Sequence, residues 1–204
     1  MNATERIRST RLVGLLRGVE RPDELVSALA AAGVEVVEVT LETPGALAAI
    51  DRLRERGDVC VVAGTVRTPA DVDAAVAAGA EACVSPAFSA PVVARCRERD
   101  VPAVPGALTP TEVEAAWRAG AELVKLFPDR AFGPAYVADL RKPLADVPLL
   151  CTGGVTTENA ADFLAAGAVA VGISFQPGTT EAEARHAAEV VASAPTADDT
   201  EERS

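Results

Sequence analysis

The stretch Ala-Ala-Gly-Val-Glu-Val-Val-Glu-Val-Thr-Leu (31–41) decides the fold. It joins the end of an alanine-rich amphipathic segment to a β-branched run through one glycine. A glycine just past the last helical turn supplies the left-handed residue that turns a chain sharply into a following strand. The stretch therefore predicts a helix that ends near residue 32 and a strand over 34–40.

The same phrase occurs three more times along the chain. Gly33, Gly79, Gly120 and Gly167 each follow an alanine and precede an apolar run, at intervals of 46, 41 and 47 residues. This spacing indicates one β-α-β-α unit repeated four times. Four such units give eight parallel strands, the number that closes into a barrel with a side-chain-filled interior.

Short apolar runs alternate with amphipathic segments over the whole length of the chain. Strands are predicted at 12–16, 34–40, 59–63, 81–85, 101–104, 122–126, 148–152 and 169–173. Helices are predicted at 22–32, 44–56, 69–78, 89–99, 110–119, 134–141, 157–166 and 180–193. Pro22, Pro69 and Pro110 stand where a first helical turn would begin.

The predicted fold class is therefore α/β, a single (β/α)8 TIM barrel. We expect one domain over residues 1–193 and an acidic, disordered tail over 194–204. An open doubly wound sheet is the alternative. A G-x-G-x-x-G motif after the first strand would favour it, and no such motif occurs there.

Composition narrows the class of protein. The chain is 49% hydrophobic but only 3% aromatic, which predicts a core of Val, Leu, Ile and Ala. A formal charge of −11 argues against a nucleic-acid partner, because binding phosphate backbones needs clustered Lys and Arg. It does not exclude a small anionic substrate, since a pocket can be locally positive.

The N-terminal segment, the length of the apolar runs and the cysteines predict a cytoplasmic protein without a membrane partner. The segment Met1 to Arg11 is polar, unlike a signal peptide, and the longest apolar runs are only strand-length. The four cysteines form no C-x-x-C pair and are expected to be buried free thiols. The single histidine, His186, falls in a predicted helix away from any chemical motif, so neither a His-rich metal site nor a His-based triad is expected.

Lysine is the sharpest sign of chemistry. The chain has two lysines, Lys125 and Lys142, against 17 arginines. Lys142 follows an arginine near a predicted helix end and is expected to be a solvated charge. Lys125 stands in the middle of the strand Leu-Val-Lys-Leu-Phe (123–127), where lost hydration favours the neutral amine and lowers its pKa. A neutral amine condenses with ketones. A purely structural ion pair with Glu38 is the alternative.

Glu38 is the expected partner of Lys125. Period-two alternation places Val34, Val36 and Glu38 on one face of their strand, and Glu35, Val37 and Val39 on the other. A carboxylate packed under helices would be costly, so Glu38 is expected inside the barrel, where it could move protons. Glu35 is expected to reach solvent.

Other polar residues follow strand ends, where barrels of this kind place their active sites. After the seventh and eighth strands come Thr152-Gly153-Gly154 and Gly172-Ile173-Ser174, the region that commonly binds phosphate. A tight turn explains a Gly-Gly pair about as well. Further candidates at the remaining strand ends are Arg17, Thr65, Pro86 and Phe127.

Seven segments lie in order along about residues 12 to 175: Leu-Leu-Arg-Gly (15–18), Ala-Ala-Gly-Val-Glu-Val-Val-Glu-Val-Thr-Leu (31–41), Ala-Gly-Thr-Val (63–66), Ser-Pro-Ala-Phe (85–88), Val-Pro-Gly (104–106), Val-Lys-Leu-Phe-Pro (124–128) and Thr-Gly-Gly-Val-Thr-Thr-Glu-Asn (152–159). Together they resemble the 2-keto-3-deoxy-6-phosphogluconate aldolase family, which includes 4-hydroxy-2-oxoglutarate and 6-phosphogalactonate variants.

The resemblance implies a role for each candidate. Lys125 resembles the family's Schiff-base lysine, and Glu38 its acid/base glutamate. The other matches are implied substrate contacts. Thr65 and Thr152 would hold the pyruvyl carboxylate or sugar hydroxyls, Pro86 and Phe127 would form apolar walls, Gly153, Gly154 and Ser174 would cradle phosphate, and Arg17 would meet the anionic end. Ordinary barrel packing is the alternative for Thr65, Pro86 and Phe127.

One position departs from the family pattern. Many members read Thr-Leu-Arg-Thr after the glutamate, whereas this chain has Thr-Leu-Glu-Thr (40–43). Glu42 would repel an anion unless it turns away, so Arg17 would carry the carboxylate-binding role or the preferred substrate differs. The stretch 125–134 is similar to the galactonate-type branch, and the sugar epimer stays open.

The implied reaction is class I cleavage of a 2-keto-3-deoxy-6-phospho sugar acid to pyruvate and glyceraldehyde 3-phosphate. It needs no metal or organic cofactor, and the resemblance suggests a homotrimer with Trp117 or Phe132 as candidate interface residues.

Three alternative functions remain. They are a metal-dependent aldolase with Glu38 and Glu42 as ligands, a non-catalytic sugar-phosphate-binding barrel, and another phosphate-binding barrel enzyme such as an isomerase or synthase.

Overall fold

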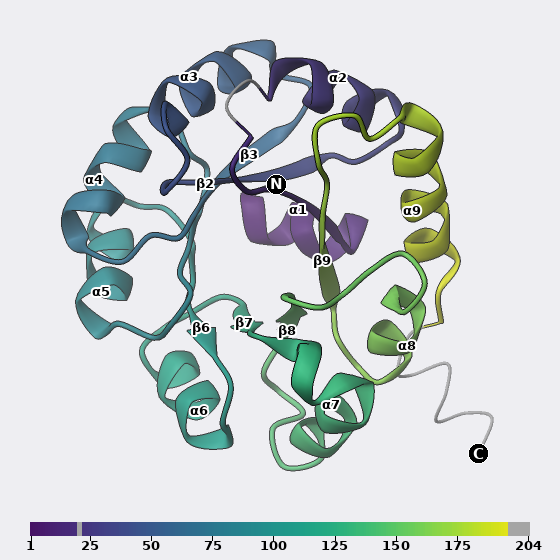
Figure 1. Ribbon diagram of the computed structural model, residues 1–204. Coiled ribbons are helices and arrows are strands. Elements are labelled where there is room, and N and C mark those ends of the chain that lie inside the picture. Colours follow the sequence, from purple (N-terminus) through teal and green to yellow (C-terminus); the bar gives the residue numbers. More distant parts are fainter. Residues whose placement is uncertain (20–21, 196–204) are drawn as a thin grey trace.

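A closed ring of parallel strands surrounded by helices forms the body of the molecule (Figure 1). The computed structural model describes residues 1–19 and 22–195. The strands are β1 (Leu12–Leu16), β2 (Val36–Thr40), β3 (Cys60–Gly64), β4 (Cys83–Val84), β5 (Ala103–Val104), β6 (Gly106–Ala107), β7 (Val124–Leu126), β8 (Leu149–Cys151) and β9 (Ala170–Ser174). Their order in the sheet is β5-β4-β3-β2-β1-β9-β8-β7-β6.

The ring closes through a strand that is broken in two. β5 and β6 stand at opposite ends of the sheet order, yet only Pro105 separates them along the chain. Proline has no N–H to donate to a ladder, which interrupts the pairing at that residue. Its carbonyl still accepts the N–H of Lys125 at 2.9 Å. The predicted fifth strand at 101–104 is therefore shorter than expected and continues beyond the proline, and the predicted TIM barrel is confirmed.

Helices follow the strands around the outside of the ring. They are α2 (Asp23–Ala31), α3 (Ala46–Arg56), α4 (Pro69–Ala77), α5 (Ala90–Glu98), α6 (Pro110–Arg118), α7 (Gly133–Arg141), α8 (Ala160–Ala165) and α9 (Glu181–Ser193), with a short 3-10 helix, η1 (Asp129–Ala131), after β7. Capping boxes begin α4, α6 and α9, where Thr68, Thr109 and Thr180 each accept a backbone N–H three residues on.

The repeated glycines end their helices as the sequence predicts. Gly33, Gly79, Gly120 and Gly167 have φ values of 88°, 94°, 95° and 105°. Each N–H donates to a carbonyl of the last helical turn, so the backbone reverses within one residue. These turns set the eightfold alternation of helix and strand.

The alternation of each strand divides the buried residues into two clusters. One lies between the sheet and the helices and holds Val37 and Val39 of β2. The other fills the barrel and holds Val36, together with Val13, Leu15, Cys60, Val62, Ala82, Val84, Val104, Leu123, Leu150 and Ala170. Val34, expected inside, packs in the outer cluster because β2 begins two residues after it. Glu35 is exposed as expected.

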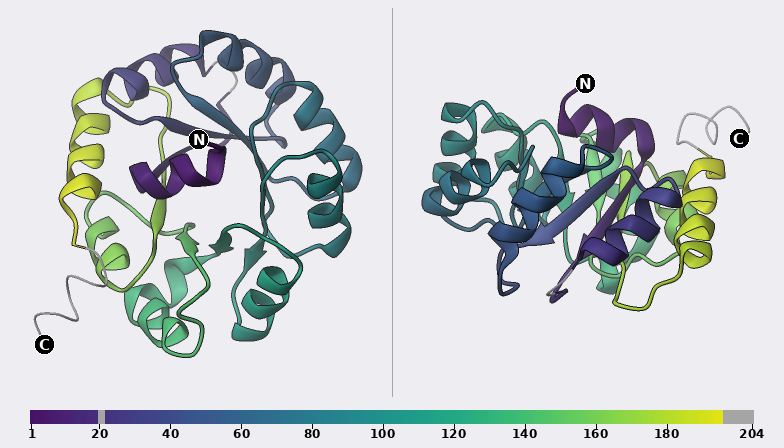
Figure 2. Two further views of the ribbon diagram at one scale, coloured as in Figure 1. Left: turned by 180° about the vertical axis from the view of Figure 1, so that it is seen from behind. Right: turned by 90° about the horizontal axis from the view of Figure 1, so that it is seen from above.

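A helix that the sequence did not predict closes one end of the barrel. α1 (Ala3–Thr10) precedes β1, and Ala3 and Ile7 pack with the interior cluster. Only these few apolar side chains face inward, which is why the segment reads as polar. Figure 2 shows α1 across the middle of the barrel in the left view and at one end of it in the right view.

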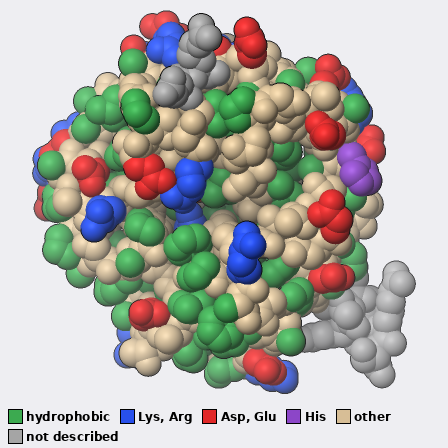
Figure 3. Space-filling model, in the orientation of Figure 1, with side chains coloured by type: hydrophobic (Ala, Val, Ile, Leu, Met, Phe, Trp, Pro, Cys, Tyr) green, Lys and Arg blue, Asp and Glu red, His purple; other side chains and the backbone are tan. Residues whose placement is uncertain are grey.

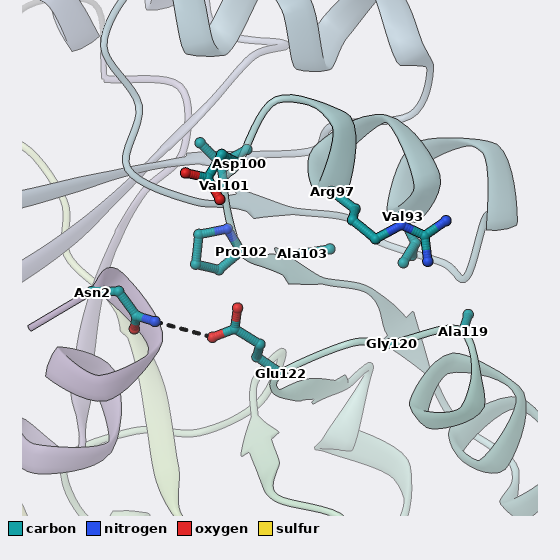
Figure 4. Close-up of a pocket in the computed structure, with 10 residues that line it drawn as sticks. All are labelled: Asn2, Val93, Arg97, Asp100, Val101, Pro102, Ala103, Ala119, Gly120 and Glu122. Carbon is teal, nitrogen blue, oxygen red and sulfur yellow. Dashed lines mark hydrogen bonds between the residues drawn. The ribbon is translucent and has the colours of Figure 1, made fainter.

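The helix is also fixed by polar contacts. Glu122, just before β7, accepts hydrogen bonds from the side chains of Asn2 and Thr4. Beside these contacts lies a cavity of about 330 Å³ between α5, β5 and the end of α6 (Figure 4). α1 is therefore tied both to the interior apolar cluster and to the rim of the barrel.

The remaining structural predictions concern single residues. Cys60, Cys83, Cys96 and Cys151 are all buried and free, and burial raises the pKa of Cys60 to about 12. Trp117 packs against the outer cluster and its indole N–H donates to Asp146. Phe132 is half exposed and its ring lies 4.9 Å from that of Tyr136.

Within residues 1–19 and 22–195, no helix has the length and apolar character needed to cross a membrane. The predicted acidic tail lies, beyond Pro195, outside the described residues. At the edge of that region, the guanidinium of Arg11 donates to the carbonyls of Ala194 and Pro195.

The contribution of α1 to stability can be measured with Ile7→Ala. Ile7 is fully buried against the barrel interior, and truncating such a side chain costs about 2–5 kcal/mol of unfolding free energy. Urea unfolding should show that loss. Arg8→Ala, an exposed position of the same helix, should change the free energy by less than about 0.5 kcal/mol. Equal effects of the two changes would contradict a plugging role for α1.

Candidate active site

Lys125 and Glu38 meet inside the barrel. Lys125 lies on β7 and Glu38 on β2, and their side chains are 4% and 0% exposed. Lys125 Nζ stands 3.4 Å from Glu38 Oε1 and 5.4 Å from the centre of the Phe127 ring. The second oxygen, Glu38 Oε2, has no hydrogen-bond partner among the described residues. The predicted juxtaposition of these two residues is confirmed, and one carboxylate oxygen stays available.

Glycines keep the space around this pair open. Gly64 and Gly172 take inward positions on β3 and β9, where other strands carry side chains. A Cβ at Gly64 would overlap the carboxylate of Glu38, and one at Gly172 would lie 2.6 Å from Leu15 Cδ1 and 2.8 Å from Thr152 Cγ2. A Cβ at Gly106 would overlap the Pro86 backbone. Glycine at these three positions therefore leaves room for Glu38, Thr152 and the Pro86 backbone, which any larger residue would displace.

The departure at Glu42 is explained by an ion pair. The guanidinium of Arg17, after β1, contacts the Glu42 carboxylate, after β2. The two side chains are 47% and 44% exposed. Thr43, beneath them, accepts the Gly18 N–H at 3.0 Å and lies 3.1 Å from the Thr40 hydroxyl. Arg17 thus neutralises the Glu42 carboxylate, and as long as this ion pair is intact Glu42 does not repel an anionic substrate.

The other predicted residues of strands three, four and six also reach this end of the barrel. Thr65 follows β3 directly and has a φ of 58°, a left-handed conformation that non-glycine residues seldom adopt. Pro86 comes shortly after β4 and Phe127 directly after β7; both are half-buried. The Phe127–Pro128 peptide bond is cis. These three residues lie at the carboxyl ends of their strands, as expected.

Thr152 is fully buried at the end of β8, and its hydroxyl oxygen has no partner among the described residues. Its position follows Leu150 by two residues, so its side chain shares the inward face of β8. A buried hydroxyl without a partner is costly, which marks Thr152 as a group that can receive a ligand.

Asp129 is a buried carboxyl group that the sequence analysis did not select. It lies on η1, is 0% exposed, and accepts the Thr152 N–H at 2.9 Å. In return the Asp129 N–H donates to the Thr152 carbonyl at 3.0 Å. Burial raises the pKa of Asp129 to about 7, against the smaller lowering effects of the Thr152 N–H and the Cys151 thiol. Asp129 therefore clamps the segment after β7 to the end of β8.

A second cavity opens beside this clamp. Its volume is about 660 Å³, and Gly153, Gly154 and Ser174 line it. Arg130 of η1 and His186 of α9 line it as well. The expectation that His186 lies far from any chemical motif is wrong, because α9 packs beside α8 and His186 lines the same cavity as Gly153 and Gly154. Figure 3 shows this face of the molecule, with basic side chains next to its centre.

The sequence analysis did not select the buried Asp129 or the cavity-lining Arg130. Asp129 and Arg130 come two and three residues after Phe127, and the search for polar residues at strand ends stopped at Phe127-Pro128. Their signal is their position: both lie in the first turn after the lysine-bearing strand, on η1. Among the described residues, no group of three or more His, Cys, Asp or Glu side chains is placed to hold a metal ion.

The geometry defines a parallel β/α barrel with a buried lysine–glutamate pair at the end where enzymes of this architecture carry their chemistry. A family model described as KDPG and KHG aldolase, the abbreviations for 2-keto-3-deoxy-6-phosphogluconate and 4-hydroxy-2-oxoglutarate, matches residues 4–191. The chain belongs to this family, and it is an aldolase, that is, a lyase.

Individual relatives agree with this membership. The chain is 39% identical over 165 residues to the 2-dehydro-3-deoxy-phosphogluconate aldolase of Treponema pallidum (strain Nichols), covering 80% of this chain and 78% of that one. It is 36% identical over 168 residues to the 2-dehydro-3-deoxy-6-phosphogalactonate aldolase of Escherichia coli (strain K12), covering 79% and 82%.

A solved structure is similar over nearly the whole fold. It is the KDPG aldolase from Legionella pneumophila with pyruvate captured at low pH as a covalent carbinolamine intermediate. The TM-score is 0.78 at 26% identity, and the match covers 91% of this chain and 94% of that one.

The raised pKa of Asp129 predicts a pH-dependent effect of Asp129→Asn on stability. A folded-state pKa near 7 against an ordinary 3.8 means that the folded state holds the proton more tightly, so this stabilisation is full below pH 4 and is lost as the pH rises through 7. Asparagine keeps the acceptor for the Thr152 N–H and does not titrate. Relative to wild type, Asp129→Asn should therefore gain about 2–4 kcal/mol between pH 4 and pH 8.

Chemical denaturation at a series of pH values measures this difference. Asp139→Asn, on the exposed face of α7, is a matched control that should show a much smaller pH dependence. If the two variants follow the same pH profile, Asp129 is ionised normally in the folded protein.

Proposed function

We propose that this protein is a class I aldolase that cleaves a 2-keto-3-deoxy-6-phospho sugar acid to pyruvate and glyceraldehyde 3-phosphate through a Schiff base on Lys125. The buried contact between Lys125 Nζ and Glu38, in a chain of this aldolase family, carries the proposal. The covalent pyruvate adduct of the Legionella relative supports imine chemistry in the family. The 6-phosphogalactonate acid is the second candidate substrate, since the Escherichia coli relative bears that name.

The reaction begins with addition of the Lys125 amine to the C2 ketone. Proton transfer and loss of water convert the carbinolamine to a protonated imine. Glu38, 3.4 Å from Nζ, supplies the proton that makes water a leaving group. Its second oxygen, without a partner among the described residues, is free to face the substrate. The protonated imine then withdraws electrons from the C3–C4 bond.

Bond cleavage needs a base for the C4 hydroxyl. Glu38 takes that proton as the C3–C4 electron pair moves into the imine, which releases the aldehyde and leaves an enamine. Protonation of the enamine at C3 and hydrolysis of the imine release pyruvate and regenerate the amine. The carboxylate alternates between base and acid, which suits a group in contact with the reacting nitrogen.

The surrounding residues take binding roles in this proposal. The Thr152 hydroxyl, which has no partner among the described residues, receives the pyruvyl carboxylate or a sugar hydroxyl, and Thr65, directly after β3, does the same. Pro86 and Phe127 form apolar walls beside the imine. Arg17, half exposed, releases Glu42 and binds the anionic end of the substrate in its place. Gly153, Gly154 and Ser174 line the cavity that would hold the phosphate.

The assembly and location stay predictions. We expect a homotrimer in the cytoplasm, no metal or organic cofactor, and neither a nucleic-acid nor a membrane partner. We also expect activity to survive EDTA, because Glu38 and Glu42, the carboxylates a metal-dependent mechanism would use, contact Lys125 and Arg17 respectively.

The decisive experiment is borohydride trapping with pyruvate. Incubation, reduction, digestion and mass spectrometry should locate a pyruvate-sized adduct on Lys125. Lys125→Arg keeps the charge but forms no imine, so it should abolish labelling and lower kcat by about three orders of magnitude or more. Lys142→Arg, at the exposed end of α7, should label normally. Activity that survives Lys125→Arg would argue against imine chemistry and favour a metal-dependent aldolase, whereas a failure of wild type to label while an authentic aldolase labels would favour a metal-dependent or a binding-only barrel.

The open space beside the pair gives a second prediction. In Gly64→Ala the added Cβ overlaps the Glu38 carboxylate and forces it away from Lys125. Since general acid–base catalysis contributes about 10²–10⁴-fold, kcat should fall by that order. Gly14→Ala, whose Cβ would lie no closer than 3.3 Å to other side chains, should retain activity. Equal kcat values in the two variants would argue against a proton-transfer role for Glu38.

A further inference from the structure

The cavity beside Gly153 and Gly154 contains backbone donors without acceptors. The N–H groups of Gly153, Gly154 and Val155 make no hydrogen bond to any residue in the part of the chain that the structure describes. The two glycines have φ values of 80° and 142°, which few other residues adopt. Consecutive free N–H groups in such a turn form a concave site for an anion.

Arg130 is held directly against this turn. Its N–H donates to the Gly153 carbonyl at 3.0 Å. A Cβ at Gly154 would lie 2.6 Å from Arg130 Cα, so the absence of a side chain there lets the η1 backbone approach. The Arg130 side chain is exposed and lines the cavity, which places a guanidinium next to the free N–H groups.

Charge pairing distinguishes Arg130 from Lys125 and Arg17. Lys125 contacts Glu38, and Arg17 contacts Glu42. Arg130 forms no ion pair with any residue that the structure describes. Its charge is therefore not compensated by a carboxylate of the fold.

The acidic residues that line the cavity are engaged elsewhere. Glu183 accepts the Thr180 N–H and hydroxyl, each at 2.8 Å, in the capping box of α9. Glu158 has a pKa held below its usual range, chiefly by a hydrogen bond from Thr156 and in part by His186. His186 thus faces a carboxylate, and we do not assign it to the ligand. Arg130 is the cation left to meet an anion.

We propose that Arg130 is a specificity-determining residue that binds the phosphate of a phosphorylated substrate, together with the N–H groups of Gly153, Gly154 and Val155. The inference rests on the proposed function, in which the phosphate lies at the end of the substrate away from the ketone. A planar guanidinium matches phosphate geometry with two parallel hydrogen bonds. Arg130 thereby makes the site prefer phosphorylated over unphosphorylated 2-keto-3-deoxy sugar acids.

Arg130→Gln tests the proposal with a matched substrate pair. The kcat and KM of the variant are measured with 2-keto-3-deoxy-6-phosphogluconate and with unphosphorylated 2-keto-3-deoxygluconate. We expect KM for the phosphorylated acid to rise about 10- to 100-fold, the size of lost charge-assisted hydrogen bonds, and KM for the other to change less than about twofold. Arg130→Lys should fall between, because it keeps a point charge without the planar fork. Arg118→Gln, exposed on α6, is the control.

Two further readouts separate the possible failures. Pyruvate trapping on Lys125 should be equal in wild type and Arg130→Gln; if wild type itself does not label, the proposed function has failed. Binding of inorganic phosphate, measured by calorimetry, should still weaken at least tenfold in Arg130→Gln. Equal changes in KM for both acids, or unchanged phosphate binding, would overturn the assignment of Arg130.

Discussion

A lysine and a glutamate buried together inside a closed sheet are the constraint on which the rest of the structure depends. Removing two charges from water costs several kcal/mol each, and their attraction offsets this only in good geometry. The fold provides that geometry by placing Lys125 on β7 and Glu38 on β2, across a ring of parallel strands. The inward glycines of β3 and β9 leave room for the pair, and apolar residues fill the layer beneath it.

The charges around the site are arranged locally within an acidic protein. The chain carries a formal charge of −11, yet Arg17, Lys125 and Arg130 all lie at the carboxyl ends of the strands. Two of them have carboxylate partners, which limits the local positive charge and explains why Glu42 is tolerated where the family pattern has an arginine. Overall acidity and an anion-binding site are therefore compatible, because field strength in a pocket depends on its own residues.

Most of the fold was predictable because its signals are local. The glycine after each helix, the proline at several first turns and the two-residue alternation of β2 each follow from backbone geometry within a few residues. The inward position of Glu38 followed from the same alternation. Val34 was misplaced because alternation says nothing about where a strand begins, and here β2 begins at Val36.

What the sequence did not reveal depends on contacts between distant segments. α1 has too few apolar residues to be recognised as a helix from its sequence. Contacts with the barrel interior and with Glu122 stabilise it. Asp129 gains its raised pKa only when η1 folds against the end of β8. His186 reaches the cavity because α9 returns to the barrel after a full circuit. These three features arise only from contacts that form once the barrel has closed, so no local stretch of sequence indicates them.

The helix at the base of the barrel also decides how molecules travel. Because α1 packs into the interior from the amino-terminal side, the described residues close that end of the barrel and leave the face with the strand-end loops as the approach to Lys125. Substrate and products must then enter and leave through the same opening. In the proposed mechanism pyruvate stays on Lys125 while the aldehyde lies nearer the opening, so this geometry would release the aldehyde first.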